Sequence, residues 1–251
     1  MDTTRFLAAC NRVLDSGRLS QGIGTLGEKS VHAVLKEYFD SRFDRHEVPV
    51  GPYVADVCNE QGFFEIQTRD FSRLRGKLEY FLDRAPVTVV FPVAAVKWVI
   101  WLDEDGAALP RHRTPRKLNA RAILPELYKV KPLLGHEGLR FCVMVMEVED
   151  YRLRDGRGED RKKGATKFDR IPVALLDEVW LEIPADFLQL VPEELPETFS
   201  AKEFSKTGKL SLSATRAGLN VLHHIGVLER VGKQGNAYIY KRAEEAAHGS
   251  D

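Results

Sequence analysis

Hydrophobic and polar positions follow two different periods along the chain. In "TTRFLAACNRVLDSG" and "EKSVHAVLKEYFDSRF" the apolar residues recur every three or four positions, which predicts two amphipathic helices. Turn sequences then separate "DRHEVPV", "YVADVC" and "FFEIQT", which predict three short strands. "DFSRLRGKLEYFLDRA" returns to the helical period, and "PVTVVFPV" and "KWVIWL" predict two further strands.

The order of these elements, α, α, β, β, β, α, β, β, predicts the fold class. A helix that connects two strands implies parallel pairing in part of the sheet, so we expect an α/β fold in which helices flank a mixed β-sheet. Farther along, "TPRKLNARAILPELYKV" predicts a helix that begins at Thr114 and Pro115. "LRFCVMVMEVEDYRL" predicts another strand.

Length and composition exclude several classes of protein. A chain of 251 residues suffices for one large domain or two modest ones. The longest apolar run, 86–102, contains Pro92 and Lys97 and does not predict a membrane helix, and the N-terminus lacks a secretory signal layout. Three widely spaced cysteines predict neither a disulfide framework nor a structural zinc site. We therefore expect a cytoplasmic protein with no membrane partner.

The net charge of zero is a sum of blocks of opposite sign. Residues 171–199 hold seven acids and no Lys or Arg, whereas residues 200–242 hold eight bases and two acids. Because "VPEELPE" lies at this change, we predict one domain over 1–191 and a second over 192–251. Within the first, "RLRDGRGEDRKKGATKFDR" predicts a basic loop at 152–170 that contacts a phosphate backbone or is simply a solvated surface loop.

Two strands of the predicted sheet carry acidic side chains. Asp56 lies in one, and Glu65 and Gln67 lie on one face of the next, because alternate residues of a strand share a face. Carboxylates that are close together and poorly solvated repel each other, and an oxygen-ligated cation such as Mg²⁺ offsets that cost. Alternatively, both acids are solvated or pair with Arg69 and Arg73.

At these positions the chain resembles the PD-(D/E)XK nuclease superfamily, whose restriction-endonuclease-like core has the order α-β-β-β-α-β. Glu28 on a helix, Asp56 on the second strand and Glu65-Ile66-Gln67 on the third match the places of that family's motif. The resemblance implies an Mg²⁺ or Mn²⁺ ion held by Asp56, Glu65, the backbone carbonyl of Ile66 and Glu28. It also implies hydrolysis of a phosphodiester with a 5′-phosphate product.

One departure from the family pattern concerns its motif lysine, which is replaced here by Gln67. A glutamine amide carries no charge and cannot act as a base near neutral pH. In some members a cation on the following helix takes this role, which makes Lys77 the substitute and Arg73 a contact to DNA; alternatively, both side chains extend to water. We therefore expect Glu28, Asp56, Glu65, Gln67 and Lys77 to be catalytic. His32, one turn after Glu28, contacts the phosphate or supports the site.

The segment 198–242 has the pattern of a small DNA-binding module. A capping box at Ser200 begins a short helix, a second helix covers 213–224, and "VLERVG" and "YIYKR" form a hairpin. This order resembles a winged helix-turn-helix domain, in which the second helix enters the major groove and the hairpin touches the backbone. Across the whole chain, we expect the following residues to contact DNA: Arg73, Arg161, Lys162, Lys163, Lys209, Arg216, Asn220, His223 and Lys233.

The two resemblances together imply an Mg²⁺-dependent DNA endonuclease, and the chemistry would be carried by the first domain and DNA binding by the second. One alternative is a DNA-binding regulator or interaction platform whose nuclease-like core is inactive. Another is a protein that mediates assembly alone. DNA is the expected partner, and a homodimer is left open.

Overall fold

The computed structural model describes residues 1–15, 30–103, 106–115, 117–153 and 166–244. The chain divides into two compact units, each built from several segments. The first unit consists of Met1–Asn59, Pro92–Asn119 and Met144–Glu178, and the second consists of Glu60–Phe91, Ala120–Val143 and Val179–Asp251. Across the part of the chain that is described, no helix is long and apolar enough to cross a membrane.

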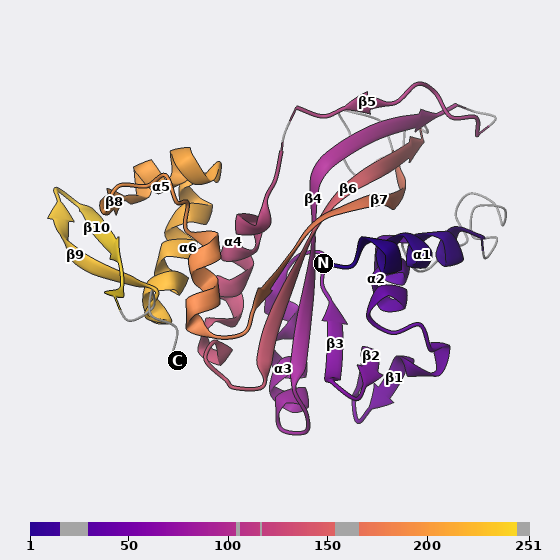
Figure 1. The fold of residues 1–251 in the computed structure, drawn as a ribbon, viewed down its shortest axis with the longest axis horizontal. Coiled ribbons are helices and arrows are strands. Elements are labelled where there is room, and N and C mark those ends of the chain that lie inside the picture. The colour runs from indigo at the N-terminus through magenta and orange to yellow at the C-terminus, as the bar shows by residue number, and fades with distance from the viewer. Residues whose placement is uncertain (16–29, 104–105, 116, 154–165, 245–251) are drawn as a thin grey trace. The chain divides into compact units, whose positions relative to one another are not determined.

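The protein has an α/β fold in which helices accompany a mixed sheet, as predicted (Figure 1). The main sheet has the strand order β1-β2-β3-β4-β6-β7, with β5 paired to β4. Its strands are β1 (His46–Val50), β2 (Tyr53–Asn59), β3 (Gly62–Ile66), β4 (Val87–Leu102), β5 (His112–Arg113), β6 (Leu139–Leu153) and β7 (Thr166–Leu181). β1 and β2 pair antiparallel, whereas β3 and β4 pair parallel, which makes the sheet mixed.

Two neighbouring helices occupy the start of the first unit, α1 (Thr3–Val13) and α2 (Ser30–Phe39). Asp2 caps α1 by accepting a hydrogen bond from the backbone N–H of Arg5 at 2.9 Å. The buried face of α1 packs on α2, where the rings of Phe6 and Tyr38 meet edge to face with centroids 6.0 Å apart. The amphipathic patterns of both segments thus produce the predicted pair of helices.

The parallel pair β3 and β4 is connected by the short 3₁₀ helix η3 (Phe71–Leu74) and by α3 (Arg75–Leu82). All five residues of β3 are buried. α3 buries Leu78 and Phe81, and the Phe81 ring lies 4.5 Å from that of Phe63 on β3. Gly62 begins β3 with a φ of +111°, and a Cβ there would lie 2.1 Å from the carbonyl oxygen of Pro86. Glycine is therefore required where the chain enters this strand.

The remaining elements of the second unit are mostly short helices and a small sheet. The helices are η4 (Ala120–Ile123), α4 (Leu124–Leu127), η5 (Tyr128–Leu133), η6 (Pro184–Leu190), α5 (Ala201–Gly208) and α6 (Leu212–His224). The strands are β8 (Thr198–Ser200), β9 (Leu228–Gln234) and β10 (Ala237–Arg242). One further short helix, η2 (Phe43–Arg45), belongs to the first unit. The three strands form a separate antiparallel sheet in the order β8-β10-β9. The predicted capping box is confirmed, because Ser200 and Glu203 bond to each other's backbone N–H groups.

α6 packs closely on α4, as Figure 1 shows for these two neighbouring helices. A Cβ at Gly218 would lie 2.9 Å from the Cβ of Leu124, which is fully buried. One face of α6 is thus committed to the core of the second unit. The opposite face, which includes Ser213 and Arg216, is exposed.

Two predictions about β4 and the segment after it were wrong. β4 is one strand of 16 residues instead of two. The fixed φ of Pro92 suits extended backbone, and the Lys97 ammonium lies 4.0 Å from the Asp150 carboxylate, so neither residue interrupts the strand. The helix predicted at Thr114 begins only at Ala120. The backbone N–H of Thr114 donates to the Lys97 carbonyl at 2.9 Å, so this threonine continues the pairing along β4 instead of capping a helix.

The predicted basic loop at 152–170 is wrong at both ends. Arg152 belongs to β6 and Arg170 belongs to β7, a strand that the charge pattern did not predict. Arg161, Lys162 and Lys163 lie outside the described residues. The predicted domain boundary at 191/192 stays a prediction; Val179–Asp251 belongs as a whole to the second unit.

Candidate functional site

Asp56 lies in the first unit, in a group of side chains of the types that can hold a metal ion. Its carboxylate Oδ2 is 3.2 Å from Nε2 of His32, and one ligand atom each from His32, Glu47 and Asp56 lie within 4.8 Å of one another. The Asp56 side chain is 14% exposed and that of His32 is 24% exposed, so both are partly shielded from water. The sequence predicted Asp56 and placed His32 beside the site, but it gave no indication of Glu47.

Local structure explains how these three residues meet. His32 and Lys36 are four residues apart on α2 and therefore lie on one face of that helix. Glu47 lies on β1 between His46 and Val48, which pair with Val57 and Ala55 of β2, and Asp56 lies between those two partners. The backbone of Glu47 has a φ of +51°, and its carboxylate accepts a hydrogen bond from the buried Lys36 ammonium at 2.7 Å. A left-handed φ at a glutamate has no sequence signature, which is why Glu47 was missed.

Glu65 lies in the second unit and forms an ion pair with Lys77 of α3. The Glu65 side chain is 3% exposed and that of Lys77 is 17% exposed, so the pair is largely dry. The Lys77 ammonium also lies 5.5 Å from the centre of the Phe81 ring. Of the two alternatives for Lys77, the structure shows the contact with the predicted catalytic acid and not extension to water.

Gln67 and Arg73 are turned toward the connection after β3. The amide nitrogen of Gln67 donates to the backbone carbonyls of Arg69 and Asp70, the latter at 3.3 Å. Arg73 is 85% exposed and lies 3.6 Å from the Asp70 carboxylate. Gln67 thus stabilises a turn, and Arg73 remains a surface cation that a nucleic acid can reach.

The remaining predicted ligands complete this description. Glu28 lies outside the described residues. Ile66 is buried at the end of β3 and pairs with Val90 of the parallel strand β4. The two groups, Asp56 with its neighbours and Glu65 with Lys77, belong to different units.

The donors around Asp56 suit a divalent cation. Two carboxylates and one imidazole provide oxygen and nitrogen ligands, and three protein ligands leave positions for water. Beside Glu65, in contrast, the Lys77 ammonium already supplies a positive charge. An ion that binds Glu65 must therefore share that carboxylate with Lys77 or displace it.

The predicted DNA-contacting residues of α6 differ in their surroundings. Arg216 is exposed. Asn220 is half-buried, and its amide oxygen accepts a hydrogen bond from Lys131 of η5 at 3.1 Å. The His223 ring lies 3.0 Å from the carbonyl oxygen of Leu228 and so helps to fix the start of β9. Of these three residues, Arg216 extends to solvent. Asn220 binds the Lys131 ammonium, which is a second cation at the same part of the helix.

The hairpin β9–β10 presents cations beside an aromatic ring. Tyr238 is 40% exposed, and the Arg230 guanidinium lies 4.3 Å and the Lys233 ammonium 4.8 Å from its ring centre. Lys209, at the end of α5, is exposed and has a left-handed backbone with a φ of +56°. Such cation and aromatic groups suit a phosphate backbone.

A further charged cluster in the first unit was not predicted. The buried carboxylate of Asp150 lies 2.9 Å from a nitrogen of Arg152 and 3.0 Å from a nitrogen of Arg170, with Lys97 at 4.0 Å. Burial raises the pKa of Asp150, but Arg170, Arg152 and Lys97 outweigh it and hold the pKa below its usual value. Three cations surround one carboxylate, so this part of the sheet has a positive local charge.

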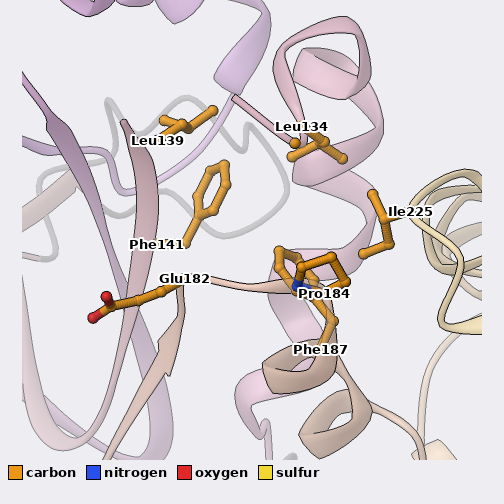
Figure 2. A pocket seen from close by; sticks show the side chains of 8 residues that line it. Leu134, Leu139, Phe141, Glu182, Pro184, Phe187 and Ile225 are labelled. Atoms are coloured by element: carbon orange, nitrogen blue, oxygen red, sulfur yellow. The ribbon is translucent and has the colours of Figure 1, made fainter. Parts of the chain in front are cut away.

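A small cavity of about 30 Å³ lies in the second unit (Figure 2). Leu134, Leu139, Phe141, Pro184, Phe187 and Ile225 give it an apolar lining, and Figure 2 shows the Glu182 carboxylate pointing away from them. A space of this size holds one or two water molecules. None of the predicted site residues lines it, so it does not serve as their substrate pocket.

A family model described as "Domain of unknown function (DUF8091)" matches residues 29–182, which is more than half of the chain. The chain belongs to this DUF8091 family. The matched range contains Asp56, Glu65 and Lys77 as well as His32 and Glu47, and it ends before the C-terminal helices. Apart from Glu28, which directly precedes the matched range, the candidate metal ligands thus belong to the DUF8091 region, whereas the predicted DNA-binding module lies beyond it.

One relative matches over most of its length. A protein of Treponema pallidum (strain Nichols), named "Uncharacterized protein", is 28% identical over 221 residues, which are 88% of this chain and 87% of that protein. The chain therefore resembles this relative beyond the DUF8091 region as well. No solved structure matches the chain.

Proposed function

We propose that the protein is a divalent-metal-dependent DNA endonuclease with the restriction-endonuclease-like fold of the PD-(D/E)XK superfamily. The observation that carries the proposal is the dry ion pair of Glu65 and Lys77, because it joins the predicted catalytic acid to the predicted substitute for the missing motif lysine. Asp56, the second predicted acid, lies among further metal-binding side chains.

The order of elements supports this fold assignment. After α2 come β1, β2 and β3, then α3, then β4, which is the family order α-β-β-β-α-β. β1 and β2 form an antiparallel hairpin, and β3 pairs parallel with β4 after the helical connection. The acids lie on the second and third of these strands, as the resemblance requires.

In the proposed reaction each residue has a distinct part. A bound Mg²⁺ or Mn²⁺ ion would lower the pKa of a water molecule and neutralise charge on the scissile phosphate. Glu65 and the carbonyl of Ile66, both in the second unit, are proposed to hold the ion, and the resemblance adds Asp56 and Glu28 to this ligand set. Lys77 would orient the attacking water and stabilise negative charge that develops on the phosphoryl oxygens. Gln67 would hold the turn after β3 through its bonds to Arg69 and Asp70, a smaller part than the sequence predicted.

The C-terminal elements support DNA as the substrate. Helices η6, α5 and α6 and the sheet order β8-β10-β9 follow the arrangement of a winged helix, with α6 as the helix that enters the major groove. Arg216 on α6 and Lys233 on the hairpin are exposed cations in the corresponding places. We therefore propose that one chain both binds DNA and cleaves it.

The test is cleavage of supercoiled plasmid by the full chain with Mg²⁺ or Mn²⁺, followed by analysis of the new ends. We expect nicked or linear DNA with 5′-phosphates, loss of cleavage in Asp56→Asn and Glu65→Gln, and retention in Glu79→Gln, which changes an exposed carboxylate of α3. Cleavage in the presence of a chelator, or full activity of both site variants, would refute the proposal.

A second candidate function is a DNA-binding regulator without hydrolytic activity. It is favoured by the replacement of the motif lysine by Gln67, whose amide is turned to backbone carbonyls. This function predicts salt-sensitive DNA binding that Arg216→Ala weakens, with no cleavage in any metal. The same plasmid assay, combined with a binding measurement, separates the two.

A further inference from the structure

The group of His32, Glu47 and Asp56 contains two donors that the proposed hydrolytic ligand set does not use. We propose that these three side chains, all in the first unit, hold a divalent transition-metal ion, for which Mn²⁺ is the natural probe. Only the carboxylate of Asp56 is common to this inference and the proposed function.

The spacing of the donors agrees with metal coordination. Two ligands bound about 2.1 Å from one ion, at angles near 90–110°, lie about 3.0–3.4 Å from each other. Nε2 of His32 and Oδ2 of Asp56 are 3.2 Å apart. Glu47 completes the group within 4.8 Å, and because its side chain is 55% exposed, it can close the remaining gap of about 1.5 Å without disturbing the core.

The chemistry of the donors selects the class of ion. Mg²⁺ prefers oxygen ligands alone and keeps most of its water, whereas imidazole suits first-row transition metals such as Zn²⁺ and Fe²⁺, and carboxylates suit Mn²⁺, which also lies above Mg²⁺ in affinity for nitrogen donors. Three protein ligands leave further positions for water, which is the arrangement of a catalytic site and not of a structural one. The site should thus bind Mn²⁺ more tightly than Mg²⁺ and leave the ion accessible to a substrate oxygen.

Lys36 gives the proposal a distinctive test. Its ammonium binds Glu47 at 2.7 Å, and its side chain is only 6% exposed. Together, the two carboxylates, this ammonium and a neutral His32 carry a net charge of −1, so removal of the lysine charge should favour a dication. If instead Lys36–Glu47 and His32–Asp56 are merely two structural pairs, Lys36→Met changes stability and leaves metal binding as it was.

The experiment measures Mn²⁺ binding by the full chain without DNA, using the electron paramagnetic resonance signal of free Mn²⁺ and calorimetry, with circular dichroism to check folding. We expect His32→Phe and Glu47→Gln each to weaken the binding of one Mn²⁺ ion at least tenfold. Lys36→Met should strengthen the binding of this ion severalfold. Glu65→Gln should retain this ion, and a hundredfold excess of Mg²⁺ should not displace it. Because Glu47 is on the surface, its variant keeps the test informative if His32→Phe misfolds.

The inference is overturned if Glu47→Gln binds Mn²⁺ like the unchanged protein, or if Glu65→Gln abolishes all Mn²⁺ binding. These results are independent of DNA cleavage. A protein that binds Mn²⁺ as expected but does not cut DNA would refute the proposed function and leave the metal site in place. Cleavage that persists in Glu47→Gln together with unchanged Mn²⁺ binding would refute the site alone.

Discussion

Replacement of Lys77 by methionine should destabilise the protein strongly. The substitution keeps the length and apolar stem of the side chain but removes the ammonium beside Glu65, whose side chain is only 3% exposed. Removal of one partner from a buried ion pair costs about 3–5 kcal/mol, because the remaining charge is poorly solvated. For a chain of this size, that loss corresponds to a decrease in the melting temperature of roughly 6–20 °C.

The assay is urea unfolding followed by circular dichroism, with two comparison variants. Arg75→Met on the same helix removes the cation of the exposed pair Arg75–Glu79 and should cost about 0.5 kcal/mol or less. In Lys77→Met/Glu65→Gln, which removes both charges of the buried pair, the loss should be smaller than in Lys77→Met alone. If Lys77→Met costs no more than Arg75→Met, the pair is solvated and the proposed geometry of Lys77 is wrong.

Three further perturbations test separate parts of the account. Gly62→Ala should cost more than 3 kcal/mol, whereas Gly235→Ala, at a φ of +60° with nothing within 4 Å, should cost only about 1 kcal/mol in the same unfolding assay. Hydrogen bonds from Arg42 lower the pKa of Asp40 from 3.8 to about 2, so its contribution of roughly 2 kcal/mol is complete above pH 4 and lost as the pH falls toward 2; Asp40→Asn should show no such loss in acid titrations of stability. Arg216→Ala should weaken DNA binding about tenfold and lower its salt dependence in fluorescence anisotropy, and an unchanged affinity would place the DNA elsewhere.

Periodicity predicted the elements whose burial is regular. The two N-terminal helices, the strands of the β1–β2 hairpin, β3 and the helix α3 all lie where the apolar spacing indicates. The capping box at Ser200 is equally local, since two side chains three residues apart bond to each other's backbone. Such features depend on interactions between residues that are close together in the sequence, so a single sequence is enough to predict them.

Elements that depend on distant partners were predicted poorly. β7 holds an apolar run at 171–176 between charged residues, and it was counted with the basic and acidic blocks of the sequence; nothing within it reveals the strand it joins. Lys97 appeared to interrupt a strand, but Asp150 lies 4.0 Å away and 53 positions later, where no local pattern connects them. The helix expected at Thr114 failed for the same reason, because β4 provides a competing partner for its backbone.

The contact between Glu65 and Lys77 could be anticipated from the sequence, because both residues lie in the strand and helix that apolar spacing predicts. The catalytic roles of Asp56, Glu65 and Lys77 stay predictions. Glu47 was missed, because its position depends on a left-handed backbone and a contact with Lys36. The grouping of His32, Glu47 and Asp56 therefore arises from the fold and not from a local sequence pattern.

The most direct test of the central claim, that Asp56 ligates a divalent ion, is an anomalous difference map from a crystal soaked in Mn²⁺. We expect a peak about 2.2 Å from a carboxylate oxygen of Asp56, with Nε2 of His32 as a second ligand. A map without a peak near Asp56, at Mn²⁺ concentrations that support DNA cleavage, would contradict it.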